Sequence, residues 1–339
     1  MTGGKAALPR ANAVSSGKLH ADVLVVGAGM AGLSAAAALR EAGLSVLTVE
    51  KGRGVGGRMA SRRVGPAVFD QGAQFVTVRD SRFATVMSEW ERRGAAREWC
   101  RGFAGDRDGH PRWCGSAAMT SVPKEIAAPL DVMLDTRLVS LRVAEGRWSA
   151  DTADGVMLTA HAAILTPPVP QSLALLDAGQ VPLPSRTRAA LSAITYECCL
   201  AVMAVLDGPS RVPPPGGFAP RSGPVGWVAD NQAKGISSVP AVTIHATDAF
   251  SRTWWDRDRQ EAGIELLRAS ERWLGAGVVV FQVHGWLYSR PVAVEKDPAL
   301  VALESPPLVF AGDAFGGARV EGAALSGWAA ASALLRLRT

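Results

Sequence analysis

The chain has 339 residues, of which 48% are hydrophobic and 20% charged, with a formal net charge of +5. This length predicts two domains or one large one, and the composition is typical of a globular protein. Only six of the 36 basic residues are lysines, and the arginines are scattered among 31 acidic residues, which argues against a nucleic-acid-binding surface.

The four cysteines (Cys100, Cys114, Cys198 and Cys199) form no C-x-x-C pair. We therefore expect reduced thiols in a reducing compartment, and no metal site. Residues 1–20 lack the apolar stretch of a signal peptide and predict a disordered tail. No apolar run reaches the roughly 20 residues that a bilayer span needs. These features predict a soluble, cytoplasmic protein without a membrane partner, and they leave the oligomeric state open.

The first ordered unit is predicted as a strand over Asp22–Val26, a helix over Met30–Ala42 and a strand over Ser45–Val49. The stretch VVGAGMAGLS joins the first strand to the helix and carries a G-x-G-x-x-G motif: Gly27, Gly29 and Gly32. Such glycines let the backbone approach a pyrophosphate, which the helix N-terminus attracts. The unit therefore predicts a dinucleotide-binding turn.

The residues after this unit distinguish between dinucleotides. Glu50 ends the second strand, where a carboxylate accepts from ribose hydroxyls and disfavours the 2′-phosphate of NADP. A second glycine pair, Gly56-Gly57, and Arg58 follow at once. NAD has no need of a second glycine segment, whereas the pyrophosphate and ribityl chain of an extended FAD pass one, and an arginine there binds phosphate. The sequence predicts FAD.

The middle of the chain predicts an amphipathic helix over Asp80–Arg93 and a β-meander over Leu134–Leu165, followed by proline-rich loops over 167–224. Three further elements are a strand near Cys198–Leu206, a helix over Arg257–Leu274 and a strand over Val278–Leu287.

The C-terminal segment VFAGDAFGGARVEGAALSG (309–327) predicts a strand, a turn and a helix. Asp313 would face a hydroxyl of the cofactor. The helix opening near Gly322 would direct its positive end toward the N1–C2=O edge of the flavin, which carries negative charge when reduced.

We therefore predict an α/β fold: a Rossmann-type FAD-binding domain and a second, mixed α+β substrate domain built on an antiparallel sheet. The FAD-binding domain takes residues 21–72, 120–168 and 300–339, and the substrate domain takes 73–119 and 169–299. No cysteine follows Cys199, so a covalent link to a C-terminal cysteine is excluded and we expect non-covalent FAD. The predicted cofactor-binding residues are Gly27, Gly29, Met30, Ala31, Gly32, Glu50, Lys51, Arg53, Gly57, Arg58, Met59, Gln74, Leu138, Thr166, Gly312, Asp313, Glu321, Gly322 and Ala323.

These motifs together resemble those of bacterial renalases, which belong to the glutathione-reductase-like flavoproteins that also include amine oxidases. The likeness runs from about residue 21 to the C-terminus and rests on VVGAGMAGLSAA, GRGVGGRMASRR, DQGAQF, WLYSRP and AGDAFGGARVEGAALSG. It is loose over 167–240, which should shape the substrate cavity. It departs where Ala318, in place of glycine, precedes Arg319.

The resemblance implies an FAD domain in three sequence pieces and an antiparallel sheet that covers the isoalloxazine. It also implies an activity: oxidation of the 2- and 6-dihydro isomers of NAD(P)H by hydride transfer to flavin N5, with O2 as acceptor and H2O2 as product. Such a transfer needs a stacked geometry and a dry cavity but no side-chain base. The partners would be a small-molecule substrate and O2.

The candidate residues around such a cavity come from both domains. We predict Gln74, His245, Tyr288 and Arg290 as catalytic, and Trp227 and Trp286 as substrate-lining. Four of them have a plainer alternative: His245 as a strand histidine with a satisfied hydrogen bond, Trp227 and Trp286 as core, and Arg290 as the partner of an acid.

Other functions remain open at this stage. An amine oxidase of this superfamily usually places a lysine, through a water, at flavin N5, but Lys234 and Lys296 lie in loop-like contexts. A desaturase or other tailoring oxidase would differ mainly in the cavity. A redox sensor without turnover would keep the FAD motifs, with the proline-rich residues 209–224 for docking. The second glycine segment and the Gly312-Asp313 turn argue against an NAD-linked dehydrogenase.

Overall fold

The computed structural model describes residues 19–103 and 106–338. Strand β1 (Leu19–Val26) begins three residues earlier than the predicted strand Asp22–Val26, so Leu19 and His20, assigned to the tail, belong to a strand. The rest of the predicted disordered tail lies outside the described residues.

The larger sheet has the strand order β16-β17-β10-β1-β2-β7, with β9 and β8 continuing from β10. β1 pairs in parallel with β10 and with β2, and β17 pairs in parallel with β10. β16 is antiparallel to β17. The strands that join β1 are β2 (Val46–Val49), β7 (Asp131–Met133), β8 (Leu138–Ala144), β9 (Arg147–Thr152), β10 (Met157–Leu165), β16 (Leu300–Glu304) and β17 (Pro307–Phe310).

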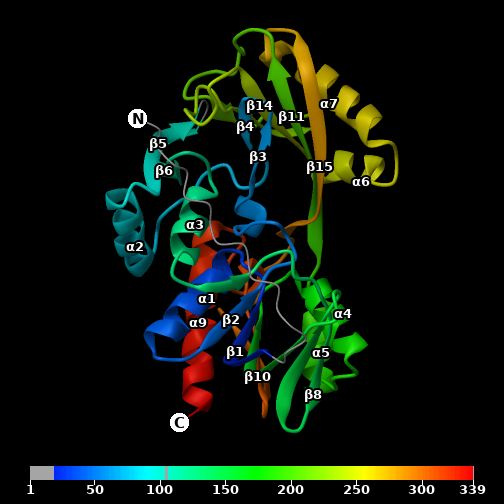
Figure 1. Cartoon of the computed structure of the whole chain (residues 1–339). Coiled ribbons are helices and arrows are strands. Elements are labelled where there is room, and N and C mark those ends of the chain that lie inside the picture. Colours follow the sequence, from blue (N-terminus) through cyan, green and yellow to red (C-terminus); the bar gives the residue numbers. More distant parts are fainter. Residues whose placement is uncertain (1–18, 104–105, 339) are drawn as a thin grey trace, which may run out of the picture.

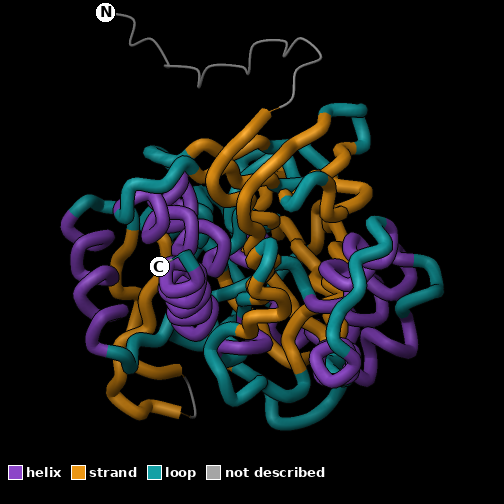
Figure 2. Tube along the Cα trace, turned by 90° about the horizontal axis from the view of Figure 1, so that it is seen from below, coloured by secondary structure: helices purple, strands orange, loops and turns teal. Residues whose placement is uncertain are grey.

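Two alanine-rich helices, α1 (Met30–Glu41) and α9 (Val320–Leu337), cover one face of this sheet. They approach each other closely because their contact surfaces are small: a Cβ atom at Gly327 would lie 2.2 Å from the carbonyl oxygen of Ala31. Seen from below, helices lie on both sides of the strands, and the C-terminal end of α9 faces the viewer (Figure 2).

The smaller sheet is antiparallel throughout, with the order β12-β13-β14-β11-β15. β11 begins with Tyr196 in the core of the larger sheet and ends with Leu206 in the core of the smaller one, so it joins the two (Figure 1). The elements of this part are β11 (Tyr196–Leu206), β12 (Gly217–Phe218), β13 (Val225–Asp230), β14 (Ala241–Ala246), β15 (Val278–Pro291), α6 (Asp248–Trp254) and α7 (Arg259–Leu274).

Shorter elements connect the two sheets. Phe69 at the end of a hairpin packs against Met203 of β11, which brings the hairpin onto the smaller sheet. These elements are η1 (Gly57–Met59), β3 (Ser61–Val64), β4 (Ala67–Asp70), α2 (Ser81–Arg92), β5 (Ala96–Phe103), β6 (Asp106–Gly115), α3 (Ser121–Ala127) and α8 (Asp313–Gly316).

The prediction of proline-rich loops after residue 167 was wrong in part, because two helices form there: α4 (Val169–Ala178) and α5 (Ser185–Ser192). Pro170 occupies the first turn of α4 and Pro184 precedes α5, positions at which a helix needs no backbone N–H. Both helices pack on the core of the larger sheet, although the predicted boundary places residues 169–299 in the substrate domain. That boundary remains a prediction.

The predicted fold class is confirmed by a Rossmann-like parallel sheet joined to an antiparallel one. The predicted meander is present as β8, β9 and β10, with one turn at Glu145-Gly146. Asp80 caps α2 by accepting from the backbone N–H of Phe83 at 3.0 Å. None of the helices within 19–103 and 106–338 is long and apolar enough to cross a membrane.

Candidate functional site

The predicted cofactor segments meet at one edge of the larger sheet. Gly27 follows β1, Glu50 follows β2, Thr166 follows β10 and Gly312 follows β17 shortly after its end. Because these four strands are parallel, their carboxyl ends lie at the same edge, where open α/β sheets bind their ligands.

The glycine turn after β1 has no room for side chains. Gly27 has a φ of +96°, and a Cβ atom at Gly32 would lie 1.9 Å from the carbonyl oxygen of Gly27. Thr166 fastens the turn from β10, since its hydroxyl donates to the carbonyl of Val26 at 2.7 Å. No side chain caps the N-terminus of α1, so its first N–H groups and its positive dipole end remain available to an anion.

Glu50 ties this turn to the following loop. Its Oε2 accepts from the backbone N–H of Ala28 at 2.9 Å, and its Oε1 accepts from that of Gly52 at 2.7 Å. A carboxylate has about four acceptor positions, so these two bonds leave capacity for ribose hydroxyls. The geometry is compatible with the predicted role of Glu50.

Arg58 and Asp313 join the second and third predicted cofactor segments. The two guanidinium Nη atoms of Arg58 donate to the two carboxylate oxygens of Asp313 at 2.6 and 2.7 Å, and one of them also donates to the carbonyl of Ser289 at 3.2 Å. The sequence predicts that Arg58 meets phosphate and Asp313 meets a hydroxyl. In the structure each is first of all the other's partner, in a bidentate pair that fixes both segments.

The start of α9 closes the site on the other side. The N-cap residue of α9 is Arg319, and its side chain makes no capping hydrogen bond within the described part of the chain. The carboxylate of Glu321 accepts from the backbone N–H groups of Arg79 and Asp80 at 2.6 and 2.8 Å, so it positions the chain ahead of α2. A Cβ atom at Gly322 would lie 2.3 Å from the carbonyl oxygen of Gly317. Only glycine fits here.

The other predicted cofactor residues lie around these segments. Lys51 donates to Oε1 of Gln171 at 2.9 Å, Arg53 and Gly57 are exposed, and Ala323 is partly buried. Four have buried side chains: Met30, Ala31, Met59 and Leu138.

A cavity of about 430 Å³ lies between the start of α9 and the smaller sheet. Residues 71–77, which we call the wall segment, supply five of its lining residues. The lining residues are Gly72, Ala73, Gln74, Phe75, Thr77, Arg79, Trp227, His245, Ala318, Arg319 and Val320.

Three of the predicted catalytic and lining residues are brought together here: Gln74, Trp227 and His245. The side-chain amide of Gln74 donates to the carbonyls of Asp70 and Gly72 at 2.6 and 3.1 Å. Its Oε1 and the Nε1 of Trp227 are buried and have no hydrogen-bond partner among the residues that the structure describes. An unpaired buried polar atom costs about 1–3 kcal/mol, so these atoms indicate a polar partner outside the chain.

His245 is a neutral hydrogen-bond donor. Its Nε2 lies 3.1 Å from the carbonyl oxygen of Gln71, and because a carbonyl only accepts, Nε2 carries the proton. Burial lowers the pKa of His245 to about 4; the nearby Lys234 ammonium acts in the same direction and the bond to Gln71 opposes it. This geometry matches the second prediction for His245, a strand histidine with a satisfied hydrogen bond.

The remaining candidates do not line the cavity. Arg290 forms a bidentate pair with Glu197 at 2.8 and 3.0 Å and its side chain is 61% exposed, which is the alternative of pairing with an acid. Trp286 donates from Nε1 to the carbonyl of Gln71 at 2.9 Å. The ring of Tyr288 packs edge-on against Tyr196. Trp286 therefore contacts the wall segment through Gln71 without lining the cavity.

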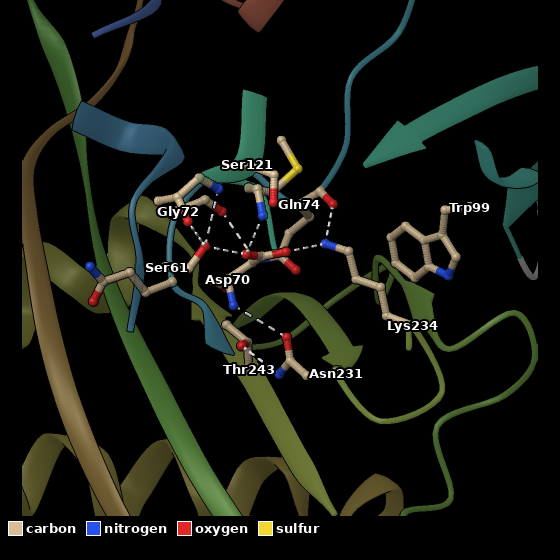
Figure 3. A network of polar contacts seen from close by, with 12 residues as sticks. Ser61, Asp70, Gly72, Gln74, Trp99, Ser121, Asn231, Lys234 and Thr243 are labelled. Carbon is tan, nitrogen blue, oxygen red and sulfur yellow. Dashed lines mark hydrogen bonds and ion pairs between the residues drawn. The ribbon is translucent and has the colours of Figure 1, made fainter. Parts of the chain in front are cut away.

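Sequence reasoning missed three charged residues of this region. Arg79 and Arg319 line the cavity, although nothing distinguishes them in an arginine-rich sequence. Lys234 does lie in a loop, as expected, but its side chain is fully buried and its Nζ pairs with Oδ2 of Asp70 at 2.7 Å (Figure 3). The presence of Asp70 in the DQGAQF motif is the only sequence signal for this pair.

These features fit an FAD molecule. The uncapped α1 behind a glycine turn suits its pyrophosphate, and the uncapped α9 beside the cavity suits the negative edge of its ring. Among the residues that the structure describes, the buried side-chain oxygens of Gln71 and Gln74 have no hydrogen-bond partner, and Gln74 lines the cavity. The group would be held by backbone donors, carboxylates and close glycine contacts.

Comparisons with known proteins agree with this geometry. A family model described as an NAD(P)-binding Rossmann-like domain matches residues 25–90, and one described as flavin containing amine oxidoreductase matches residues 80–335. Among solved structures, a variant of a putrescine oxidase has a TM-score of 0.69 at 18% identity, over 95% of this chain and all of that one. A cyclohexylamine oxidase from Brevibacterium oxydans has a TM-score of 0.67 at 14% identity, over 93% and 99% of the two chains. A protein described as a protoporphyrinogen oxidase from Exiguobacterium gives 0.68 at 13%, over 96% and 100%.

The Arg58–Asp313 pair leads to a prediction on cofactor retention. Arg58→Ala leaves the largely buried Asp313 carboxylate without its partner and frees two segments of the site. We expect the Kd for FAD, measured by quenching of flavin fluorescence, to rise about tenfold or more. The control is Arg63→Ala, which removes an exposed arginine of β3. Unchanged FAD affinity in Arg58→Ala would show that the pair does not hold the site together.

The low pKa of His245 leads to a prediction on pH dependence. Because the pKa lies near 4, the imidazole is neutral above that value, and its protonation occurs only at lower pH. We expect kcat/KM to show no histidine inflection between about pH 5 and 8. His245→Gln, which keeps a donor toward Gln71, should have the same profile in this range. An inflection near the ordinary histidine pKa that disappears in His245→Gln would contradict this.

Proposed function

The chain belongs to the flavin-containing amine oxidoreductase family and is an FAD-dependent oxidoreductase, and on that premise we propose the substrate. The proposed reaction is oxidation of the 2- and 6-dihydro isomers of NAD(P)H to NAD(P)⁺, with O2 as electron acceptor. This is the reaction that the resemblance to renalases implies.

The observation that carries the proposal is the charge of the cavity. Arg79 and Arg319 reach it from different segments, both are exposed, and neither forms an ion pair with another residue that the structure describes. No carboxylate is among the lining residues. Two unpaired guanidinium groups attract the pyrophosphate of a dinucleotide and repel a protonated amine. This charge favours a dinucleotide substrate.

The position of Lys234 also supports a substrate other than an amine. Amine oxidases of the superfamily usually place a lysine at flavin N5 through a water. Here Lys234 is paired with Asp70 and does not line the cavity, and Lys296 is exposed. The residues that line the cavity therefore provide no ammonium group for that arrangement.

The chemistry divides between the cofactor and the chain. When bound, FAD would supply the hydride acceptor and the route by which two electrons reach O2. Phe75 and Trp227 line the cavity and pack with Phe103 at ring-centroid distances of 4.9–5.6 Å. This apolar side of the cavity would limit the access of water to the reacting carbon. His245 stays neutral and donates to the wall segment. The overall balance is dihydronicotinamide dinucleotide, O2 and one proton giving NAD(P)⁺ and H2O2.

An amine oxidase or a tailoring oxidase is the second candidate. It is supported by the family match and by the fold shared with a putrescine oxidase and a cyclohexylamine oxidase. Those structures are less than 20% identical to this chain, so the likeness concerns the fold. Substrate choice depends on the cavity lining, whose arginines favour the first candidate.

The experiment that tests the proposal is an anaerobic titration. The holoenzyme is mixed with the 2- and 6-dihydro isomers of NADH or with primary amines, and flavin absorbance is followed. We expect the isomers to bleach the flavin rapidly, and air to restore the colour with release of H2O2. Rapid bleaching by an amine, with no response to the isomers, would support the second candidate and overturn the first.

The arginines of the cavity lead to a prediction on specificity. Arg79→Gln and Arg319→Gln should each raise KM for the dihydro dinucleotide about tenfold, because a charge-assisted hydrogen bond contributes about 1.5–3 kcal/mol. They should leave KM for a dihydronicotinamide without phosphate unchanged. Arg147→Gln, an exposed arginine of β9, is the control. Equal effects on both substrates would show that neither guanidinium contacts phosphate.

A further inference from the structure

The wall segment has little backbone structure of its own. It follows β4 and belongs to no helix or strand, apart from a single bridge between Val76 and Trp113. Its geometry therefore depends on side chains that reach it from elsewhere. His245 and Trp286 both donate to the carbonyl of Gln71, and Arg58 accepts through its own carbonyl from the backbone N–H of Ala73 at 2.8 Å.

Lys234 is the charged member of this set. Its Nζ donates to Oδ2 of Asp70, the last residue of β4 directly before the wall segment, and to the backbone carbonyl of Gln74, in the middle of that segment. Figure 3 shows the ammonium group between these two acceptors. One buried cation thus fixes the distance between the end of β4 and the middle of the wall segment, which carries Gln74.

Lys234 is itself held firmly. It lies in a tight turn, residues 230–236, in which Oδ1 of Asp230 accepts from the backbone N–H groups of Gln232 and Ala233 at 2.8 and 2.9 Å. The ring of Trp99 covers its Nζ at 4.8 Å from the ring centroid. Within the same turn, Oδ1 of Asn231 accepts from the backbone N–H of Asp70 at 3.3 Å. The turn and the wall segment are therefore joined at two points.

We propose that Lys234 is a positioning residue, which holds the wall segment and Gln74 against the bound flavin and takes no part in proton transfer. This inference rests on the proposed function for its kinetic readout only. Both acceptors of the ammonium group are fixed protein atoms, and the side chain is fully buried. An ammonium group that is buried and hydrogen-bonded to two fixed acceptors cannot move. A general acid or base, in contrast, has to lie within hydrogen-bonding distance of the reacting atoms.

The test compares Lys234→Met, Asp70→Asn and the double variant with the wild-type holoenzyme. Lys234→Met alone leaves a buried carboxylate unpaired and is expected to unfold easily. The double variant removes both charges, so it should fold and bind FAD, but the carbonyl of Gln74 has lost its donor. We expect kcat to fall tenfold or more, with a smaller change in KM, and the flavin reduction potential and visible spectrum to shift.

The matched control is Leu266→Ala, which removes a fully buried side chain between α7 and the smaller sheet and lowers stability away from the cavity. It should melt no higher than the double variant, yet keep the wild-type kcat, potential and spectrum. This control separates loss of stability from loss of position.

Two results would overturn the inference. The first is a double variant with the wild-type kcat, flavin reduction potential and visible spectrum. This result would show that Lys234 only compensates the charge of Asp70 and does not position the wall segment. The second is a basic limb in the wild-type pH profile that disappears in the double variant, which would make Lys234 an acid–base group. If neither the wild-type holoenzyme nor any variant oxidises the dihydro isomers, the proposed function is wrong. The potential and the spectrum, measured with a chemical reductant, still decide the role of Lys234.

Discussion

An irregular peptide that forms the wall of a cavity cannot be held by its own hydrogen bonds. In this protein residues 71–77 are such a peptide, and the buried pair of Asp70 and Lys234 fastens them. A buried ion pair stabilises little relative to apolar packing, but it fixes geometry, since each partner requires the other. His245 and Trp286 add two donors at Gln71. The shape of the cavity follows from these contacts.

Side-chain bonds between distant segments also organise the edge of the larger sheet at which the predicted cofactor segments meet. Four parallel strands bring their carboxyl ends together, which is a property of the sheet. The loops that leave this edge are then joined in pairs, Glu50 to the glycine turn and Arg58 to Asp313. The Arg58–Asp313 pair also reaches the end of β15 through the carbonyl of Ser289. The cofactor segments and the smaller sheet are therefore held as one unit.

The sequence predicts which segments meet at the edge of the larger sheet better than it predicts the cavity, for physical reasons. Glycine spacing, the acid after β2 and the final strand–turn–helix are local patterns, and a parallel sheet brings them together whatever its other contacts. The cavity depends on pairs far apart in the chain, such as Asp70 and Lys234, and a loop-like context says nothing about burial. Arg290 shows the opposite case. The WLYSRP motif predicts it as a catalytic residue, but it forms an ion pair with Glu197 on the neighbouring strand. The helices α4 and α5 are not evident in this proline-rich segment because proline usually interrupts a helix, whereas Pro170 lies in the first turn of α4 and Pro184 precedes α5.

The measurement that tests the central claim most directly is binding of the product to the oxidised holoenzyme. If the cavity is shaped and charged for a dinucleotide, NAD⁺ should perturb the flavin spectrum saturably. Its apparent Kd should rise with ionic strength, because salt screens the two arginines. Alkyl and aryl primary amines should leave the spectrum unchanged. Saturable binding of an amine, with no effect of NAD⁺ at any ionic strength, would contradict the account.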